Sequence, residues 1–325
     1  MPNYADYEYF LSATLLVSAM FGMGTSLTPT DFLAVARSPQ NVLLILGIQV
    51  LLTPLLVMGL AKAFFLPTEI VIGLFVAAAL PGGLFSNIYT FLGKGNVALS
   101  VAATALCTLA CLFTTTFVLR VFAAQHLPDT FQMPTRDILF EIGICLLLPM
   151  LAGMIFRRWF PRRAASVAKF CVRASVVLLL LVAAAALSGG KIDVTDFGLR
   201  VPLAIILLQV CLLWSSYGLC KLLRLSLNDT FTVAIEVLVR NSHLGVLLKA
   251  ALFPADVAAN DAIGGAVLYA VLFYGFVCMV VGAGEVVGKL RFWGVYAKLR
   301  DLVTTEEPSQ TAEPQAGRAA SQVDE

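Results

Sequence analysis

Charge is scarce in this sequence. Only 13% of the 325 residues are Asp, Glu, Lys or Arg, the formal net charge is +2, and there are two histidines. A near-neutral chain without a concentrated basic face does not suit nucleic acid, so we expect no nucleic-acid partner. We also expect no organic cofactor.

The cysteines show no metal-binding or disulfide spacing, and all seven lie within apolar runs: Cys107, Cys111, Cys145, Cys171, Cys211, Cys220 and Cys278. They are interpreted as small hydrophobic side chains in helices. A basic region at the start of the chain is also missing, because the first ten residues include acids but no Lys or Arg. We therefore expect no cleavable signal peptide.

The sequence is unusually rich in long runs of hydrophobic residues. Hydrophobic residues make up 59% of the chain, and the mean hydropathy is +0.89, well beyond the range of soluble domains. A membrane-spanning helix needs ~20 mainly apolar residues. We expect nine such segments, at about 8–26, 40–64, 69–93, 97–124, 137–157, 168–188, 198–222, 230–253 and 262–286. The segments are uniformly apolar rather than alternating, which predicts an all-α polytopic protein in a lipid bilayer.

Basic residues predict the orientation. Those after the fifth segment mark a cytoplasmic connection: Arg157, Arg158, Arg162, Arg163, Lys169 and Arg173. Nine spans then place the C-terminus in the cytoplasm and residues 1–7 outside the plasma (inner) membrane. We divide the chain into a transmembrane domain (8–286), a cytoplasmic basic segment (287–303) and a polar tail (304–325) expected to be disordered.

Two of the apolar segments are interrupted. Pro81, Gly82 and Gly83 interrupt the third, and polar residues from Glu236 to Gly245 interrupt the eighth. Such a break is tolerated at membrane depth only where it is buried in protein or lines a cavity. A proline kink in a packing helix is the alternative. Two breaks at corresponding positions favour an inverted repeat, with a first repeat at about 8–124 (four spans) and a second at about 137–286 (five spans).

Charged residues inside the eighth segment are costly and usually mark an ion or substrate pathway. Glu236 and Arg240 are four residues apart, so on a continuous helix they would share one face and form an ion pair. Oxygen-bearing side chains accompany them: Ser86 and Asn87 at the first break, and Ser100 and Thr104 on one face of the fourth segment. Such a set suits sodium, although Ser and Thr also bond to their own helix.

Three stretches resemble the bile acid:sodium symporter family: F-G-M-G-T-S-L-T-P-T-D-F (21–32), P-G-G-L-F-S-N-I-Y-T-F-L-G-K-G-N-V-A-L-S-V-A-A-T (81–104) and E-V-L-V-R-N-S (236–242). Gln49 and Pro54 add to the resemblance, which covers about residues 15–290. It implies a core domain with two crossed broken helices, a panel domain that moves against it, and two sodium (Na+) sites coupled to uptake of a small organic anion.

The resemblance implies ligands for both ions. The first site would use Ser86, Asn87, Ser100, Thr104 and Glu236. The second would use Glu236, the carbonyls of Val237 and Val239, the Gln49 side chain, and a glutamine at position 240, where this chain has Arg240. A guanidinium has donors only and repels a cation ~4 Å away by about 4 kcal/mol. We therefore expect Arg240 to replace the second sodium as a tethered cation, which leaves coupling through one site.

Residues around the two breaks are the expected substrate ligands: Leu84, Phe85, Asn87, Arg240, Asn241 and His243. The family places the anion at helix N-termini. Leu84, Phe85 and His243 depart from its usual residues, which predicts a narrower and more apolar pocket. A small carboxylate or a sterol-like acid is the expected substrate.

Other functions stay open at this stage. His243 could couple transport to protons, transport could be uncoupled, or the chain could be a receptor derived from this fold. A channel would need a continuous polar file, whereas polarity is confined to the two breaks. An enzyme is not expected, because the adjacent Ser242 and His243 do not face each other on a helix.

Overall fold

The computed structural model describes residues 4–31, 39–127, 134–188, 197–254 and 261–305. The α-helices are α1 (Tyr4–Gly24), α3 (Pro39–Gly47), α4 (Thr53–Ala63), α5 (Thr68–Ala79), α6 (Leu84–Leu92), α7 (Val97–Val118), α8 (Thr135–Glu141), α9 (Leu148–Trp159), α10 (Pro161–Ser188), α11 (Arg200–Leu222), α12 (Leu227–Leu238), α13 (Ser242–Leu252) and α14 (Asp261–Thr305). The all-α polytopic prediction is confirmed. Within the described ranges, six continuous helices are long and apolar enough to cross a bilayer. The count of nine spans and the inverted repeat stay predictions.

Two of these six long helices contain a π-helical stretch before a proline. Ile48–Leu52 joins α3 to α4 ahead of Pro54, and Ile142–Leu147 joins α8 to α9 ahead of Pro149. Proline cannot donate the backbone hydrogen bond of a regular α-helix, and a wider turn accommodates that loss. The first of these stretches contains Gln49, which it places inside the protein, 4% exposed.

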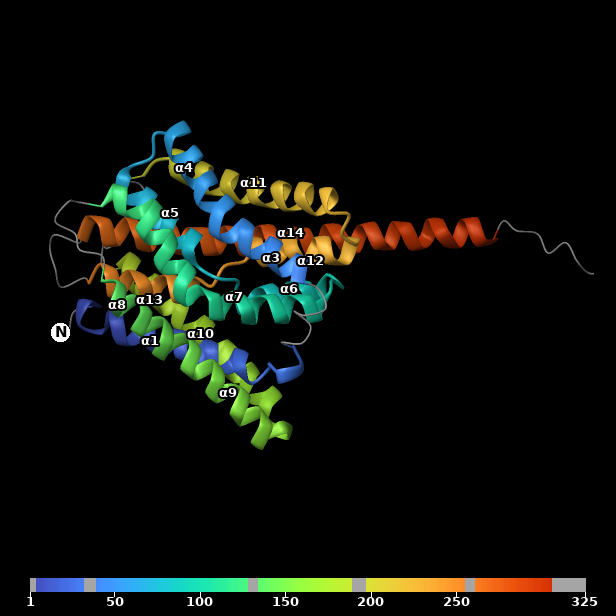
Figure 1. Ribbon diagram of the computed structural model, residues 1–325, viewed down its shortest axis with the longest axis horizontal. Coiled ribbons are helices and arrows are strands. Elements are labelled where there is room, and N and C mark those ends of the chain that lie inside the picture. Colours follow the sequence, from blue (N-terminus) through green and yellow to red (C-terminus); the bar gives the residue numbers. More distant parts are fainter. Residues whose placement is uncertain (1–3, 32–38, 128–133, 189–196, 255–260, 306–325) are drawn as a thin grey trace, which may run out of the picture.

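The helices form a bundle with three parts (Figure 1). α1 packs mainly against α9 and α10, and together they occupy one side of the molecule. α4 and α11 lie on the opposite side, with α14 running between the two groups and continuing well beyond the rest of the bundle. α13 contacts both α1 and α14, so it lies where the first group meets the remainder.

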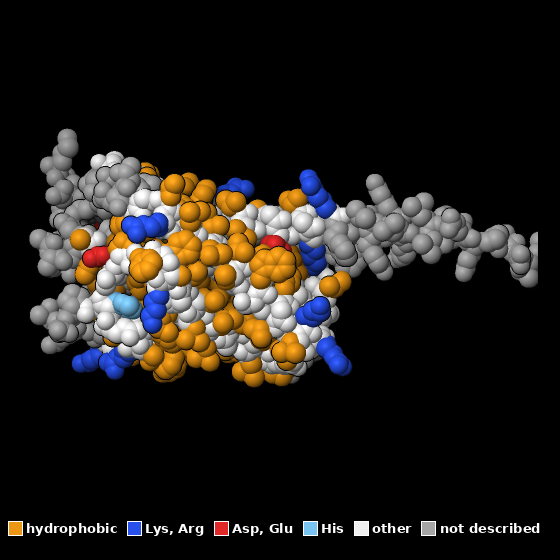
Figure 2. All heavy atoms as spheres, turned by 90° about the horizontal axis from the view of Figure 1, so that it is seen from above, with side chains coloured by type: hydrophobic (Ala, Val, Ile, Leu, Met, Phe, Trp, Pro, Cys, Tyr) orange, Lys and Arg blue, Asp and Glu red, His pale blue; other side chains and the backbone are white. Residues whose placement is uncertain are grey.

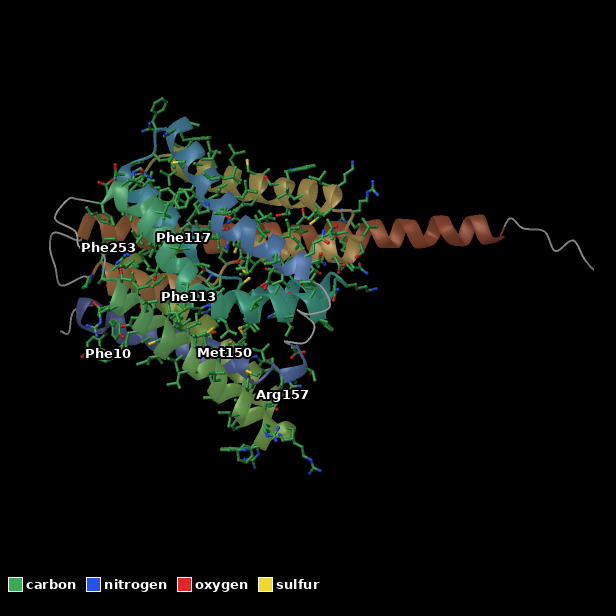
Figure 3. All side chains as sticks on the ribbon, viewed as in Figure 1. Phe10, Phe113, Phe117, Met150, Arg157 and Phe253 are labelled. Carbon is green, nitrogen blue, oxygen red and sulfur yellow. The ribbon has the colours of Figure 1, made fainter. Side chains whose placement is uncertain are left out.

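The surface has the distribution expected for a bilayer-embedded protein. Figure 2 shows hydrophobic side chains over the middle of one face, with Lys and Arg gathered near its two ends. Large apolar side chains such as Phe10 on α1 and Phe113 on α7 are 68% and 72% exposed (Figure 3). Exposed apolar area on this scale suits contact with lipid tails.

The C-terminal helix is longer than the sequence pattern predicts. We expected the last span to end at residue 286, but α14 continues through the basic segment to Thr305. Lys, Arg, Leu and Ala in residues 287–305 are good helix formers and this stretch contains no proline, so the helix continues through Gly288 and Gly294. The predicted disordered tail is corrected at its first two residues, 304 and 305, which belong to α14, and the rest of it lies outside the described residues.

A buried ion pair joins α1 to α13. Lys249 Nζ lies 2.5 Å from Glu8 Oε1, and the two side chains are 6% and 3% exposed. Breaking a buried pair leaves an uncompensated charge, which typically costs about 3–5 kcal/mol. Lys249→Met is therefore expected to lower the apparent melting temperature of the detergent-purified protein markedly.

Two further variants test this prediction. Lys62→Met, which removes an exposed lysine, should leave the melting temperature nearly unchanged. Adding Glu8→Met to Lys249→Met should recover most of the loss, because no buried charge then stays unpaired. Equal melting temperatures for Lys249→Met and Lys62→Met would contradict the prediction.

Candidate functional site

The two predicted breaks are present, and they lie against each other. α5 ends at Ala79 and α6 begins at Leu84, while α12 ends at Leu238 and α13 begins at Ser242. The residues between them are extended and pair as a short antiparallel β-bridge centred on Gly82 and Arg240. Gly83 N donates to Val239 O at 3.1 Å, and Asn241 N donates to Pro81 O at 3.0 Å.

This pairing explains how irregular backbone is tolerated inside an apolar bundle. Each break removes intrahelical hydrogen bonds, and a buried backbone group left unpaired costs free energy. Here the two breaks supply partners to each other. The place where the two breaks meet, called the crossing below, is therefore held together by backbone hydrogen bonds.

Glycine at position 82 permits the close approach of a carboxylate. A Cβ on Gly82 would lie 2.2 Å from Glu236 Oε1, well inside van der Waals contact. Gly83 is also confined, because its Cβ would lie 3.1 Å from the carbonyl oxygen of Arg240. The Pro-Gly-Gly run thus provides both the break and the space for Glu236.

Glu236 is the centre of a buried oxygen cluster. Its side chain is 0% exposed, and the carboxylate accepts hydrogen bonds from two residues of α7. Thr104 Oγ1 donates to Oε1 at 2.5 Å, and Ser100 Oγ donates to Oε2 at 3.1 Å. The helical spacing of Ser100 and Thr104 therefore presents both hydroxyls to one carboxylate, as expected from the sequence.

The first two turns of α6 complete the cluster. Asn87 Oδ1 lies 2.8 Å from Ser100 Oγ and 3.3 Å from Thr104 Oγ1, so it shares the single proton of each hydroxyl with the Glu236 carboxylate. Ser86 Oγ lies 3.4 Å from Thr104 Oγ1 and donates to Gly83 O at 2.7 Å. All five residues predicted for the first sodium site thus meet at one place, although they come from α6, α7 and α12.

The cluster has the chemistry that a hard cation requires. Hydroxyl, amide and carboxylate oxygens are the ligands of such ions, and one carboxylate supplies the negative charge. In the structure these side chains form hydrogen bonds with one another. A cation bound among them would be coordinated by the lone pairs of the same oxygen atoms. The residues therefore fit a sodium ion.

Arg240 does not pair with Glu236, so the expected ion pair is wrong. Among the described residues, no carboxylate oxygen lies within 4.0 Å of its guanidinium. Nη1 donates to Leu80 O and Nη2 donates to Thr53 Oγ1, both at 2.8 Å. The physical reason is local: α12 ends at Leu238, so the spacing of four residues no longer places the two side chains on one helical face.

The guanidinium instead occupies the end of α5. Leu80 is extended (ψ 142°) and its carbonyl is one of those freed by the break. A cation near the last turn of a helix interacts favourably with the helix dipole. Arg240 thus places a fixed positive charge, 2% exposed, at the C-terminal end of α5.

Other residues predicted for the second site are also close to the crossing. Gln49 Nε2 donates to the backbone oxygen of Glu236 at 3.2 Å, so this side chain presents its donor to α12. The carbonyl of Val239 accepts from Gly83 N. Val237 is fully buried in the last turn of α12. At this second site Arg240 stands in place of the expected glutamine, and the Gln49 amide and the Val239 carbonyl already make hydrogen bonds within the protein.

A cavity of about 530 Å³ opens beside the crossing. Phe85, Arg240 and His243 line it, as predicted for a substrate pocket, and the rest of the wall comes mainly from α10 and α14. Its volume is within the range of small-molecule sites, and its lining is overwhelmingly apolar.

The other three residues predicted to bind substrate lie elsewhere or have other partners. Asn87 belongs to the oxygen cluster. Asn241 caps α13, since its Oδ1 accepts from Leu244 N, and Leu84 does not line the cavity. Sequence reasoning missed Thr53, which accepts from Arg240, because a single hydroxyl in an apolar helix gives no signal of its role.

Comparison with known proteins gives independent findings. A family model described as the sodium bile acid symporter family matches residues 13–196. An uncharacterized sodium-dependent transporter of Bacillus subtilis is 33% identical over 244 residues, 75% of this chain and 75% of that protein. A probable sodium/metabolite cotransporter of the Arabidopsis thaliana chloroplast is 27% identical over 257 residues, 79% of this chain and 63% of that protein. A sodium-dependent organic anion transporter of Rattus norvegicus is 29% identical over 189 residues, 57% of this chain and 51% of that protein.

Proposed function

Because the chain belongs to the sodium bile acid symporter family, we propose that it is a secondary transporter that couples sodium entry to uptake of an organic anion. The names of its relatives indicate sodium dependence, and one of them indicates an organic anion. The family is one of transporters, so the chain is not an enzyme. We also propose that it lies in the plasma membrane with its N-terminus outside and its C-terminus in the cytoplasm.

The oxygen cluster is the observation that supports this function. Five polar side chains from three helices meet inside an apolar bundle, at the crossing of two broken helices. Buried polar groups at membrane depth are costly, and a packing role alone would not require so many oxygens around one carboxylate. A single sodium ion bound there explains the cluster.

Arg240 gives a reason for one sodium rather than two. Glu236 with two sodium ions would have a net charge of +1. Glu236 with Arg240 and one sodium has the same charge, so the guanidinium preserves the electrostatics of the loaded site while removing one ion. Its hydrogen bonds to Leu80 O and Thr53 Oγ1 hold it there.

The substrate would bind in the cavity between α10, α14 and the start of α13. α1, α8, α9 and α10 would form the panel domain, and the remaining helices would form the core. Movement of one group against the other would expose this cavity to each side of the membrane in turn. The resulting net charge of +1 beside the cavity favours an anion.

Uptake by proteoliposomes tests the proposal. The purified protein should accumulate at least one organic acid from a labelled panel when an inward sodium gradient is imposed, and not when potassium replaces sodium. Equal uptake in the two gradients would contradict sodium coupling. Ligand-induced stabilisation without any uptake would indicate a receptor instead.

Gly82 provides a structural test of the same site. Gly82→Ala would place a methyl group 2.2 Å from Glu236 Oε1, which forces the carboxylate out of the cluster. We expect sodium affinity, measured by sodium-induced thermal stabilisation, to fall at least about tenfold, or about 1.4 kcal/mol. Gly218→Ala is the matched control, because a Cβ there meets nothing within 4 Å. Similar sodium affinity in both variants would count against the site.

A further inference from the structure

The first half of α10 has one face that packs on the protein. Ala164, Cys171 and Ser175 share this face, since they are spaced by seven and four residues, and Ala164 and Ser175 are buried. The face packs on α1, where a Cβ at Gly22 would lie only 2.8 Å from Cys171 Cβ. The opposite face of α10 therefore points away from the protein.

Basic residues form a stripe on that outward face. Arg162, Lys169 and Arg173 have the same spacing of seven and four residues, and all three are exposed. Arg162 precedes Ala164 by two residues, which is roughly 200° around the helix axis, so the stripe lies opposite the face that packs on α1. At 1.5 Å per residue, the stripe is about 16 Å long. These three residues are called the basic stripe below.

A tight corner fixes the start of the basic stripe. α9 ends at Trp159 and α10 begins at Pro161, so Phe160 alone joins the two helices. The carbonyl of Phe160 accepts from Arg163 N at 3.0 Å and from Ala164 N at 3.1 Å. The backbone of the corner therefore holds the first turn of α10 in place.

One arginine near the corner has a role within the fold. Arg157 Nη1 donates to the backbone oxygen of Ser26 at 2.8 Å, just beyond the end of α1. Arg157 lies at the far end of this group of helices from Phe10 (Figure 3). The basic stripe has no comparable use, because its side chains form no ion pair or hydrogen bond with another described residue.

The first turn of α10 carries charge of the sign that a helix disfavours there. The N-terminal end of a helix has a partial positive charge, which favours acidic side chains and repels basic ones. α10 instead begins Pro161-Arg162-Arg163, with no acid in its first turn, and the sequence has no Asp or Glu between residues 142 and 188. An anion from outside the protein would remove this repulsion and pair with the guanidinium groups.

The exposed side chains of α10 follow the layers of a bilayer. They are basic from Arg162 to Arg173 and then become apolar, with Val177 55% exposed and Leu181 53% exposed. At the corner Trp159 is 71% exposed, and tryptophan is enriched at the interface between lipid and water. The basic stripe therefore lies at the depth of the lipid headgroups when the apolar part of α10 contacts lipid tails.

We propose that the basic stripe is a docking surface for the headgroups of anionic phospholipids in the surrounding bilayer. Guanidinium groups match phosphate oxygens and can bind them through two parallel hydrogen bonds. Clusters of basic residues beside a membrane span are also attracted to an anionic lipid surface. This inference goes beyond the proposed function, because it requires neither transport nor a bound sodium ion.

Lipid binding to the detergent-purified protein, followed by native mass spectrometry, tests the proposal. Phosphatidylglycerol should bind at least about tenfold more tightly than phosphatidylcholine with the same tails. The triple variant Arg162→Gln, Lys169→Gln and Arg173→Gln should weaken phosphatidylglycerol binding at least about tenfold and leave phosphatidylcholine binding unchanged. The melting temperature without added lipid should also stay unchanged, because these exposed side chains have no partner among the described residues.

The matched control removes the same charges from another part of the protein. It combines Arg200→Gln, Lys221→Gln and Arg224→Gln, which are also exposed, and should retain phosphatidylglycerol binding. Equal phosphatidylglycerol affinity in the two triple variants would overturn the proposal, because only total charge would then matter. Equal binding of the two lipids by the wild type would overturn it as well. Inorganic phosphate that binds as tightly as phosphatidylglycerol would show a surface for free anions instead of lipid.

Discussion

Glu236→Gln is expected to abolish sodium-dependent uptake. Glutamine keeps the size of the side chain and one oxygen, but it removes the negative charge that balances a sodium ion in a site 0% exposed to solvent. At ~4 Å and an effective dielectric of ~20, that attraction is about 4 kcal/mol. We expect apparent sodium affinity to fall at least about a hundredfold, or about 2.7 kcal/mol. The apparent sodium affinity is measured from the dependence of uptake on sodium concentration in proteoliposomes.

Two variants distinguish this effect from general damage. Thr104→Val keeps the charge but removes one oxygen of the cluster, so a smaller loss of about tenfold in sodium affinity is expected. Glu285→Gln removes a carboxylate of α14 that accepts from the Tyr217 hydroxyl of α11, and it should leave sodium affinity unchanged. Unchanged sodium dependence in Glu236→Gln would show that the ion binds elsewhere.

Arg240→Gln is expected to change the number of coupled ions. It removes the fixed positive charge beside Leu80 O and provides an amide oxygen, the residue type that the family resemblance places at this position. A second sodium could then bind without the repulsion of a guanidinium. The Hill coefficient for sodium in uptake should rise from about one to about two.

Arg240→Met is the matched variant for this prediction. Methionine removes the charge without offering a good oxygen ligand, and it leaves Leu80 O and Thr53 Oγ1 without their donor. Uptake should fall sharply because these buried oxygen atoms stay unpaired and no second ion replaces the lost charge, while the Hill coefficient stays near one. A wild-type coefficient near two that Arg240→Gln leaves unchanged would contradict the role of Arg240.

Much of the fold could be predicted from the pattern of hydrophobic residues. Long, uniformly apolar runs predict helices, because a helix pairs its backbone groups within the segment. Both breaks lie where Pro81 to Gly83 and the polar residues after Glu236 suggest. The meeting of Ser100 and Thr104 with Glu236 also follows from helical periodicity and the resemblance.

The partners of Arg240 could not be predicted in the same way. Spacing along the chain gives side-chain proximity only while the helix continues, and here the helix ends two residues before Arg240. The direction of its side chain is set by Leu80 and Thr53, which lie about 160 and 187 positions earlier.

The number of sodium ions bound per protein is the most direct test of the central claim. Equilibrium binding of radioactive sodium to the purified wild-type protein, in the presence of a transported anion, should saturate at about one ion per chain, and Arg240→Gln should raise this to about two. Saturation of the wild type at two ions would contradict the claim that Arg240 takes the place of one of them.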